Sequence, residues 1–141
     1  FASQLQLNEI EKGFIQDRTI YEDVEIFAKN LFKLGFISQR DWDTYNNLFS
    51  NMVQFLKTPD LIIYLKAETD TLISRIKNRN RDFEKEIDIE YLHTLNIAYD
   101  KWINDIKDIK ILKIETDNFN IFKDREYLSN VYKNIEEKLD G

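Results

Sequence analysis

Residues 61–65 read LIIYL, a run of apolar and aromatic side chains in which no polar residue alternates. A strand with one face in water alternates between apolar and polar residues, whereas a parallel strand covered on both faces does not. The preceding TPD (58–60) is a helix-breaking sequence that separates this run from the segment before it. The stretch therefore predicts a parallel strand covered on both faces.

Helical and strand patterns alternate on both sides of this strand. The hydrophobic spacing predicts helices over residues 2–12, 22–35, 38–56, 68–79, 89–106 and 121–139. It predicts two further strands, GFIQD (13–17) and IKILKI (109–114). Strands that alternate with helices indicate an α/β fold in which helices flank a parallel sheet in three layers.

The number of predicted strands is small for five or six helices. Buried parallel strands with open edges leave backbone N–H and C=O groups unpaired. The chain also starts at Phe1, without an initiator Met and inside helical sequence. We therefore expect residues 1–141 to be one domain whose remaining strands lie N-terminal to Phe1, although a processed chain would explain the abrupt start equally well.

The composition excludes several classes of function. The 141 residues carry a formal net charge of -6, no cysteine and one histidine. A chain without cysteine forms no disulfides and suits a reducing cytosol, and one histidine disfavours a His-based metal centre or a Ser-His triad. The acidity disfavours nucleic-acid binding, which needs a basic face. No apolar run approaches the roughly 20 residues that span a membrane.

Positive charge gathers in one short segment of this acidic chain. Arg75, Lys77, Arg79 and Arg81 occupy alternate positions at the predicted end of a helix. Such cations could simply complement the helix dipole and face solvent. They could also close over a polyphosphate, because the planar guanidinium group binds phosphate with two hydrogen bonds. The spacing alone favours the first interpretation.

A second polar cluster, QDRTIYED (16–23), directly follows the predicted strand 13–17. In open α/β sheets, ligands bind at the carboxyl ends of strands. The cluster therefore fits a site that handles a phosphate or a sugar. The alternative is a surface ion pair between Asp17 and Arg18, with Thr19 as a helix cap.

Five stretches follow one another along the chain: DRTIYED (17–23), IFAKNL (26–31), DLIIYL (60–65), RIKNRNRDFE (75–84) and EYLHTLNIAYDKWI (90–103). In this order they resemble the deoxynucleoside kinases, over roughly residues 13–115. The resemblance implies a P-loop NTPase-like nucleoside/nucleotide kinase fold that is incomplete at its N-terminus. It also implies a cytoplasmic salvage enzyme, usually a homodimer, that uses Mg²⁺ and transfers the γ-phosphoryl of ATP or another NTP to the 5′-hydroxyl of a deoxyribonucleoside.

The resemblance also assigns roles on the acceptor side. Arg18 would stabilise charge at the transferring phosphoryl, and Asp17 would lie beside the Mg²⁺ ion. Asp23 would read the edge of the base, and Phe27 would pack near the base. Gln4 would be one of the polar base-reading side chains.

The lid, about residues 78–88, would engage both substrates. By resemblance, Arg79 and Arg81 clamp the phosphates, and Arg75 stacks near the donor's adenine. Glu84 would accept a hydrogen bond from the 3′-hydroxyl of the sugar. Following the last predicted strand, Asp117 and Phe119 would flank the adenine.

Two parts of the family pattern are missing from this sequence. It contains neither the glycine-rich loop G-x-x-x-x-G-K-[ST] nor the acid that serves as general base. We therefore expect the chain alone to be inactive and the natural protein to be longer. Two alternatives stay open: a thymidylate-kinase-like enzyme, which the acids Glu22 and Asp23 disfavour, and a non-catalytic nucleotide-binding domain.

Overall fold

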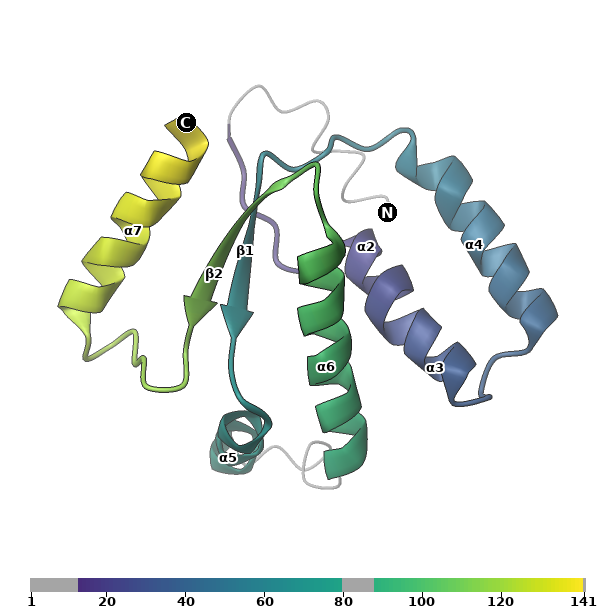
Figure 1. The fold of residues 1–141 in the computed structure, drawn as a ribbon, viewed down its shortest axis with the longest axis horizontal. Helices are drawn as coiled ribbons and strands as arrows, with labels where there is room; N and C mark the ends of the chain where they lie inside the picture. Colours follow the sequence, from purple (N-terminus) through teal and green to yellow (C-terminus); the bar gives the residue numbers. More distant parts are fainter. Residues whose placement is uncertain (1–12, 80–87, 141) are drawn as a thin grey trace. The chain divides into compact units, whose positions relative to one another are not determined.

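The computed structural model describes residues 13–79 and 88–140. Its contacts divide the chain into two compact units, Phe1–Thr58 and Pro59–Gly141. Figure 1 shows the elements in chain order: α2 (Ile20–Glu22), η1 (Asp23–Ala28), α3 (Lys29–Lys33), α4 (Gln39–Val53), β1 (Leu61–Lys66), α5 (Thr69–Arg79), α6 (Ile89–Asp105), β2 (Lys110–Glu115) and α7 (Arg125–Asp140).

In the first unit, the predicted helix 22–35 is found as one helical run through α2, η1 and α3. The run ends at Gly35, which has a φ of 79°. There the Phe36 N–H donates to the Leu31 carbonyl at 3.0 Å, and the Gly35 N–H donates to the Phe32 carbonyl at 3.0 Å. These two bonds form a Schellman motif, which requires the left-handed conformation that glycine adopts without strain. The predicted stop at Gly35 is confirmed.

The helix α4 begins where the predicted helix 38–56 does, with Ser38 as its N-cap. The Asp41 N–H donates to Ser38 Oγ at 3.2 Å, which satisfies one of the unpaired donors at the helix start. Aromatic rings join α4 to the preceding helices: Trp42 stacks on Phe32 with ring centroids 5.2 Å apart. These ring contacts pack α4 within this unit.

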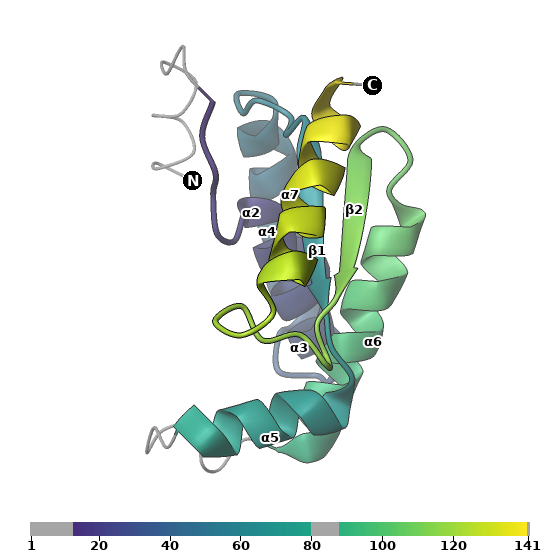
Figure 2. The ribbon, with the colours of Figure 1, turned by 90° about the vertical axis from the view of Figure 1, so that its left-hand side faces the viewer.

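In the second unit, β1 and β2 form a parallel pair, in register from Leu61 opposite Lys110 to Lys66 opposite Glu115. Figures 1 and 2 show α6 on one face of this pair and α7 on the other. Ile103 of α6 is buried on one side, and Ile114 of β2 is buried as well. The predicted α/β fold with a parallel sheet between helices is confirmed.

One strand prediction is wrong, and another is right for the strand but wrong for its burial. Residues 13–17 form no strand, and Ile15 is 96% exposed. The apolar run lacks what a strand needs, because no other segment in the described ranges forms a ladder with it. The strand β1 is present, but Leu65 is 63% exposed. Within the described residues, β1 is half-buried on the face toward α6 and exposed at Ile63 and Leu65 on the other face.

The last helix begins four residues later than predicted. The Asn120 N–H donates to Asp124 Oδ2 at 2.6 Å, and the Phe122 N–H donates to Asn120 Oδ1 at 3.0 Å. Asn and Asp side chains that bind nearby backbone N–H groups stabilise turns in place of helix. Residues 120–124 accordingly form a loop before Arg125. The predicted helix 2–12 lies outside the described residues.

Candidate functional site

The polar cluster after residue 16 is held by the start of the first helix. The Thr19 N–H donates to the Glu22 carboxylate at 2.8 Å, which fixes the chain where the helix begins. Arg18, just before it, has a φ of 61°, the left-handed conformation that costs a residue with a side chain roughly 1–2 kcal/mol. Backbone strain of this kind is typical of functional positions. The Cζ atom of the Arg18 guanidinium lies 5.9 Å from the centroid of the Phe27 ring.

Asp23 and Phe27 both lie in the π-helical segment η1. Single π-turns inside α-helices occur often at functional sites. The buried residues Val24, Ile26 and Ala28 anchor this segment, while Asp23 is exposed. The structure thus brings together the predicted acceptor-side residues Arg18 and Phe27, with Asp23 one turn before Phe27.

Tyr45 of α4 lies close enough to this cluster for the charge of Asp23 to change its pKa. Burial raises the pKa of Tyr45 above its usual value, and the negative charge of Asp23 raises it further. The sequence pattern of the predicted helix 38–56 gives no sign of this neighbour.

In the second unit, Arg75 is bound at the carboxyl ends of both strands. Its Nη1 donates to Thr116 Oγ1 at 3.0 Å, and its Nη2 donates to the Thr116 carbonyl. Thr116 itself is buried, and both its N–H and its hydroxyl donate to the Lys66 carbonyl at 2.8 Å. The guanidinium of Arg75 therefore has a fixed place at the strand ends. Thr116 was not among the predicted site residues, although its position directly after a strand is a signal for a site.

Asp117 contacts the beginning of α5. Its Oδ1 accepts a hydrogen bond from the Glu68 N–H at 2.9 Å. The Thr71 hydroxyl, the Glu68 N–H and the charge of Arg75 together lower the pKa of Asp117, and the hydrogen bond from Thr71 contributes most. The predicted donor-side residues Arg75 and Asp117 thus lie at the same junction.

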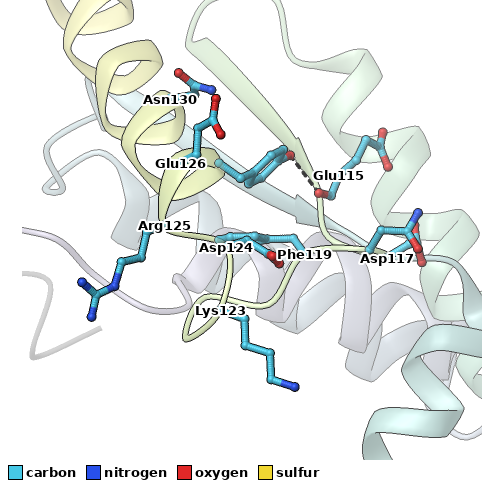
Figure 3. A pocket seen from close by; sticks show the side chains of 10 residues that line it. Glu115, Asp117, Phe119, Lys123, Asp124, Arg125, Glu126 and Asn130 are labelled. Carbon is cyan, nitrogen blue, oxygen red and sulfur yellow. Dashed lines mark hydrogen bonds between the residues drawn. The ribbon is translucent and has the colours of Figure 1, made fainter.

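A pocket of about 870 Å³ lies beside the loop between β2 and α7 (Figure 3). It is lined by the predicted residues Asp117 and Phe119, and by Tyr127 at the start of α7. The Phe119 and Tyr127 rings lie 4.6 Å apart, and the Tyr127 hydroxyl donates to the Glu115 carbonyl at 3.0 Å. Lys123 also lines the pocket. Tyr127 and Lys123 were not among the predicted site residues, because the hydrophobic spacing predicts one longer helix that contains both.

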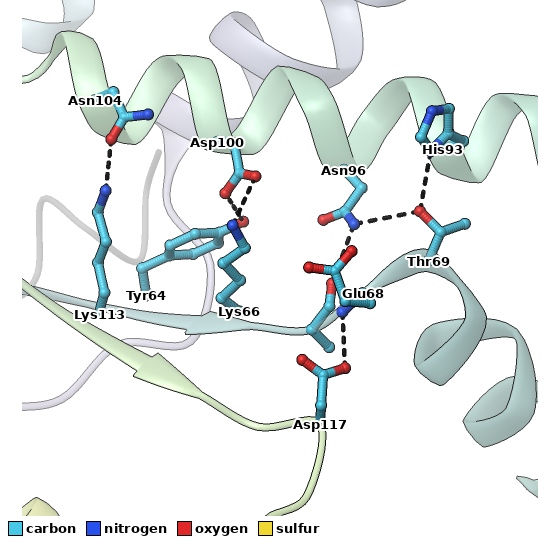
Figure 4. A network of polar contacts seen from close by, with 11 residues as sticks. Tyr64, Lys66, Glu68, Thr69, His93, Asn96, Asp100, Asn104, Lys113 and Asp117 are labelled. Carbon is cyan, nitrogen blue, oxygen red and sulfur yellow. Dashed lines mark hydrogen bonds and ion pairs between the residues drawn. The ribbon is translucent and has the colours of Figure 1, made fainter.

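A row of polar contacts holds α6 against the sheet (Figure 4). The Tyr64 hydroxyl donates to Asp100 Oδ1 at 3.1 Å, and Lys66 Nζ lies 3.0 Å from Asp100 Oδ2. Nearer the strand end, Asn96 Nδ2 donates to the Ala67 carbonyl at 3.0 Å. Burial, and then Asp100, raises the pKa of Tyr64, while the hydrogen bond to Asp100 raises the pKa of Lys66. These contacts fix α6 beside the carboxyl end of β1.

The remaining predicted residues are less constrained. Arg79 is the exposed last residue of α5. Asp17 is exposed beside Arg18. Gln4, Arg81 and Glu84 lie outside the described residues. In residues 13–79 and 88–140, no group of three His, Cys, Asp or Glu side chains is arranged to hold a metal ion, and no helix is long and apolar enough to cross a membrane.

Relatives of known function match almost the whole chain. It is 42% identical over 134 residues to deoxyadenosine kinase of Dictyostelium discoideum, covering 94% of this chain and 53% of the relative. It is 32% identical over 137 residues to deoxyadenosine/deoxycytidine kinase of Bacillus subtilis, covering 96% of this chain and 63% of the relative. The chain therefore spans between half and two thirds of the length of these relatives.

Solved structures show the same fold. Deoxyadenosine kinase from M. mycoides with bound dATP matches with a TM-score of 0.72 and 32% identity, over 91% of this chain and 67% of that chain. The same enzyme with dCMP and dCDP bound matches with a TM-score of 0.75 and 31% identity, over 95% of this chain and 69% of that chain. The family model for deoxynucleoside kinases matches residues 1–140. The chain belongs to the deoxynucleoside kinase family.

Proposed function

We propose that the full natural protein is an ATP-dependent deoxynucleoside kinase of nucleotide salvage, and that this chain supplies its acceptor and lid residues within a single domain. The observation that carries the proposal is the DRTIYED segment. In it Arg18 is held in a strained backbone conformation beside Phe27, with Asp23 on the same helical run. The acidic pair Glu22 and Asp23 disfavours the thymidylate-kinase-like alternative, because a monophosphate acceptor needs a cation there.

The proposed mechanism relies on positioning and on electrostatic stabilisation. Phosphoryl transfer spreads negative charge over the equatorial oxygens of the transferred group, and an arginine that meets this charge contributes ~10³–10⁵ in rate. Arg18 would provide this charge from the acceptor side, and Arg79 and Arg81 from the lid. Glu84 would bind the 3′-hydroxyl of the sugar. The general base and the phosphate-binding loop are not in this sequence.

Asp17 would be this chain's contribution to a Mg²⁺ site. Mg²⁺ at nucleotide sites is commonly bound by one or two carboxylates together with the substrate phosphates and water. The exposed Asp17 carboxylate beside Arg18 fits this pattern. When bound, Mg²⁺ neutralises charge on the donor phosphates.

On the donor side, we propose that ATP or another NTP binds near Arg75, Asp117 and Phe119. Support comes from the 870 Å³ pocket that Asp117 and Phe119 line, and from the place of Arg75 at the same strand ends. An aromatic ring and a fixed guanidinium are both suited to stack on a purine base.

On the acceptor side, Gln4 is proposed as a base-reading residue.

We propose deoxyadenosine as the preferred acceptor. The Asp23 carboxylate accepts hydrogen bonds, and adenine presents an exocyclic amino group that donates them. The 42% identity to a deoxyadenosine kinase supports the same choice. A panel of four deoxynucleosides with ATP tests it: we expect deoxyadenosine to be phosphorylated fastest and thymidine slowest, since thymine has no exocyclic amine. Thymidine as the best acceptor would contradict the assignment of Asp23.

We further propose that the protein is a cytoplasmic homodimer. The absence of cysteine suits a reducing compartment. Leu48 of α4 is 56% exposed and Phe36 is 77% exposed, and exposed apolar side chains of this kind suit a helical interface between two copies. Light scattering of the full protein should give twice the mass of one chain, and a monomer would refute this part of the proposal.

A further inference from the structure

The junction between the strand ends and α5 has an unusual helix cap. A helix start is commonly capped by the side chain of the residue just before it. Here the Glu68 N–H at the start of α5 instead bonds to Asp117, which lies 49 residues further along the chain (Figure 4). The capping bond therefore joins α5 to the loop after β2, which local capping would not do.

A second contact joins the same two elements further along α5. Arg75 donates from two guanidinium nitrogens to the hydroxyl and the carbonyl of Thr116. Thr116 is only 7% exposed and is bonded in turn to the Lys66 carbonyl. An arginine side chain has many rotamers, and two bonds to one buried residue fix both its direction and the plane of its guanidinium.

We propose that Thr116 and Asp117 are positioning residues for the phosphate donor. Together they hold α5, with Arg75 and Arg79, in a fixed relation to the loop that carries Phe119. The inference deepens the proposed function and rests on it. The two consecutive residues Thr116 and Asp117 thereby fix the positions of the arginines of α5 and of the aromatic residue that lines the pocket.

The hydroxyl of Thr116 is tested with two variants of the full protein. Thr116→Val keeps the shape of the side chain and removes the acceptor for Arg75 Nη1, whereas Thr116→Ser keeps the hydroxyl. We expect the Val variant to raise KM for ATP about tenfold, as loss of a hydrogen bond to a charged group would. We also expect KM for the deoxynucleoside to stay within about twofold in this variant, and the Ser variant to behave like the wild type.

A merely structural role would give a different pattern. If the Val variant raised both KM values equally, or lowered kcat alone, Thr116 would not position the donor site. Equal effects of Val and Ser would show that the hydroxyl is not responsible. Either result overturns the inference.

The role of Asp117 is tested without any enzymatic assay. We expect Asp117→Ala to speed hydrogen exchange of the Glu68 amide by more than about tenfold, because the amide loses its acceptor. Asp117→Asn keeps an acceptor oxygen and should protect the amide nearly as well as Asp. Unchanged exchange in the Ala variant would overturn the positioning of α5. Because this readout needs no ATP, it separates a failure of the inference from a failure of the proposed kinase activity.

Discussion

At the scale of single residues, Arg18 combines an unfavourable backbone conformation with a place in the proposed acceptor site. Its positive φ is unfavourable for arginine, and its guanidinium lies beside Phe27 at the predicted acceptor side. A sequence pattern reveals the charge of Arg18 but not its φ, since a non-glycine residue adopts the left-handed region only when its surroundings impose it. The conformation therefore could not be predicted from the residue alone.

This strain gives a prediction for stability. We expect Arg18→Gly to be more stable than Arg18→Ala by about 1 kcal/mol, because glycine adopts a positive φ without a steric penalty. Both variants should lose activity, because neither has a guanidinium. Urea unfolding of the full protein measures the difference. An alanine variant at least as stable as the glycine variant would show that the backbone at residue 18 is not strained.

Asp23 gives a prediction for substrate binding. We expect Asp23→Ala to weaken binding of the deoxynucleoside by roughly tenfold or more, since a hydrogen bond to a charged group is lost, with little change for ATP. Titration calorimetry with each ligand separates the two effects. Asp41→Ala, at the start of α4, is the control for loss of a helical carboxylate. If ATP affinity alone fell in the Asp23 variant, Asp23 would belong to the donor side.

The lowered pKa of Asp117 gives a prediction for pH dependence. A carboxyl group with a lowered folded-state pKa stabilises the fold above its ordinary pKa of 3.8, and this contribution is lost as the pH falls through the lower folded value. The stability difference between the wild type and Asp117→Asn should therefore shrink as the pH falls from 7 to 3. Asp70→Asn, at an exposed position of α5, is the matched control. A difference that grew on acidification would contradict the hydrogen bonding of Asp117.

At the scale of elements, the sequence predicts best where local patterns determine structure. The start of the helix 38–56, the end of the helix 22–35 and the apolar strand 61–65 are all found where expected, because each depends on nearby residues. The extended segment 13–17 and the start of α7 were predicted wrongly. A strand depends on a partner elsewhere in the chain, and the turn at Asn120 outweighs helical periodicity through side-chain bonds to the backbone.

The same difference between local patterns and long-range contacts applies to the candidate site. The DRT triplet and the arginines of α5 are visible in the sequence, while the contacts of Arg75 with Thr116 and of Asp117 with Glu68 join segments about 40 to 50 residues apart. Periodicity contains no information on such pairs. The π-helical segment around Asp23 is likewise a product of packing rather than of a recognisable motif.

The contact that holds α6 against the sheet gives a prediction at the scale of elements. Tyr64→Phe removes the hydroxyl that donates to Asp100, and we expect a loss of about 0.5–1.5 kcal/mol in the free energy of unfolding. Tyr132→Phe is the matched control, because Tyr132 is 58% exposed on α7. Denaturant titration compares the two. Equal stability of both variants would mean that the Tyr64–Asp100 bond does not hold α6.

At the scale of the whole molecule, the chain divides into two compact units. The residues proposed for the acceptor side belong to the first unit, and those proposed for the donor side belong to the second. The chain has a net charge of -6, and three of its six arginines nevertheless lie within residues 75–81. The family relationship explains why these residues occur in this order along the chain.

The most direct test of the central claim follows the γ-phosphate itself. The full natural protein is incubated with Mg²⁺, deoxyadenosine and ATP labelled in the γ-phosphate, and the products are separated. The account predicts label in deoxyadenosine 5′-monophosphate, and a fall in kcat of ~10³ or more in Arg81→Ala with an unchanged circular dichroism spectrum. No transfer of label to any deoxynucleoside, or wild-type turnover by the Arg81 variant, would contradict it.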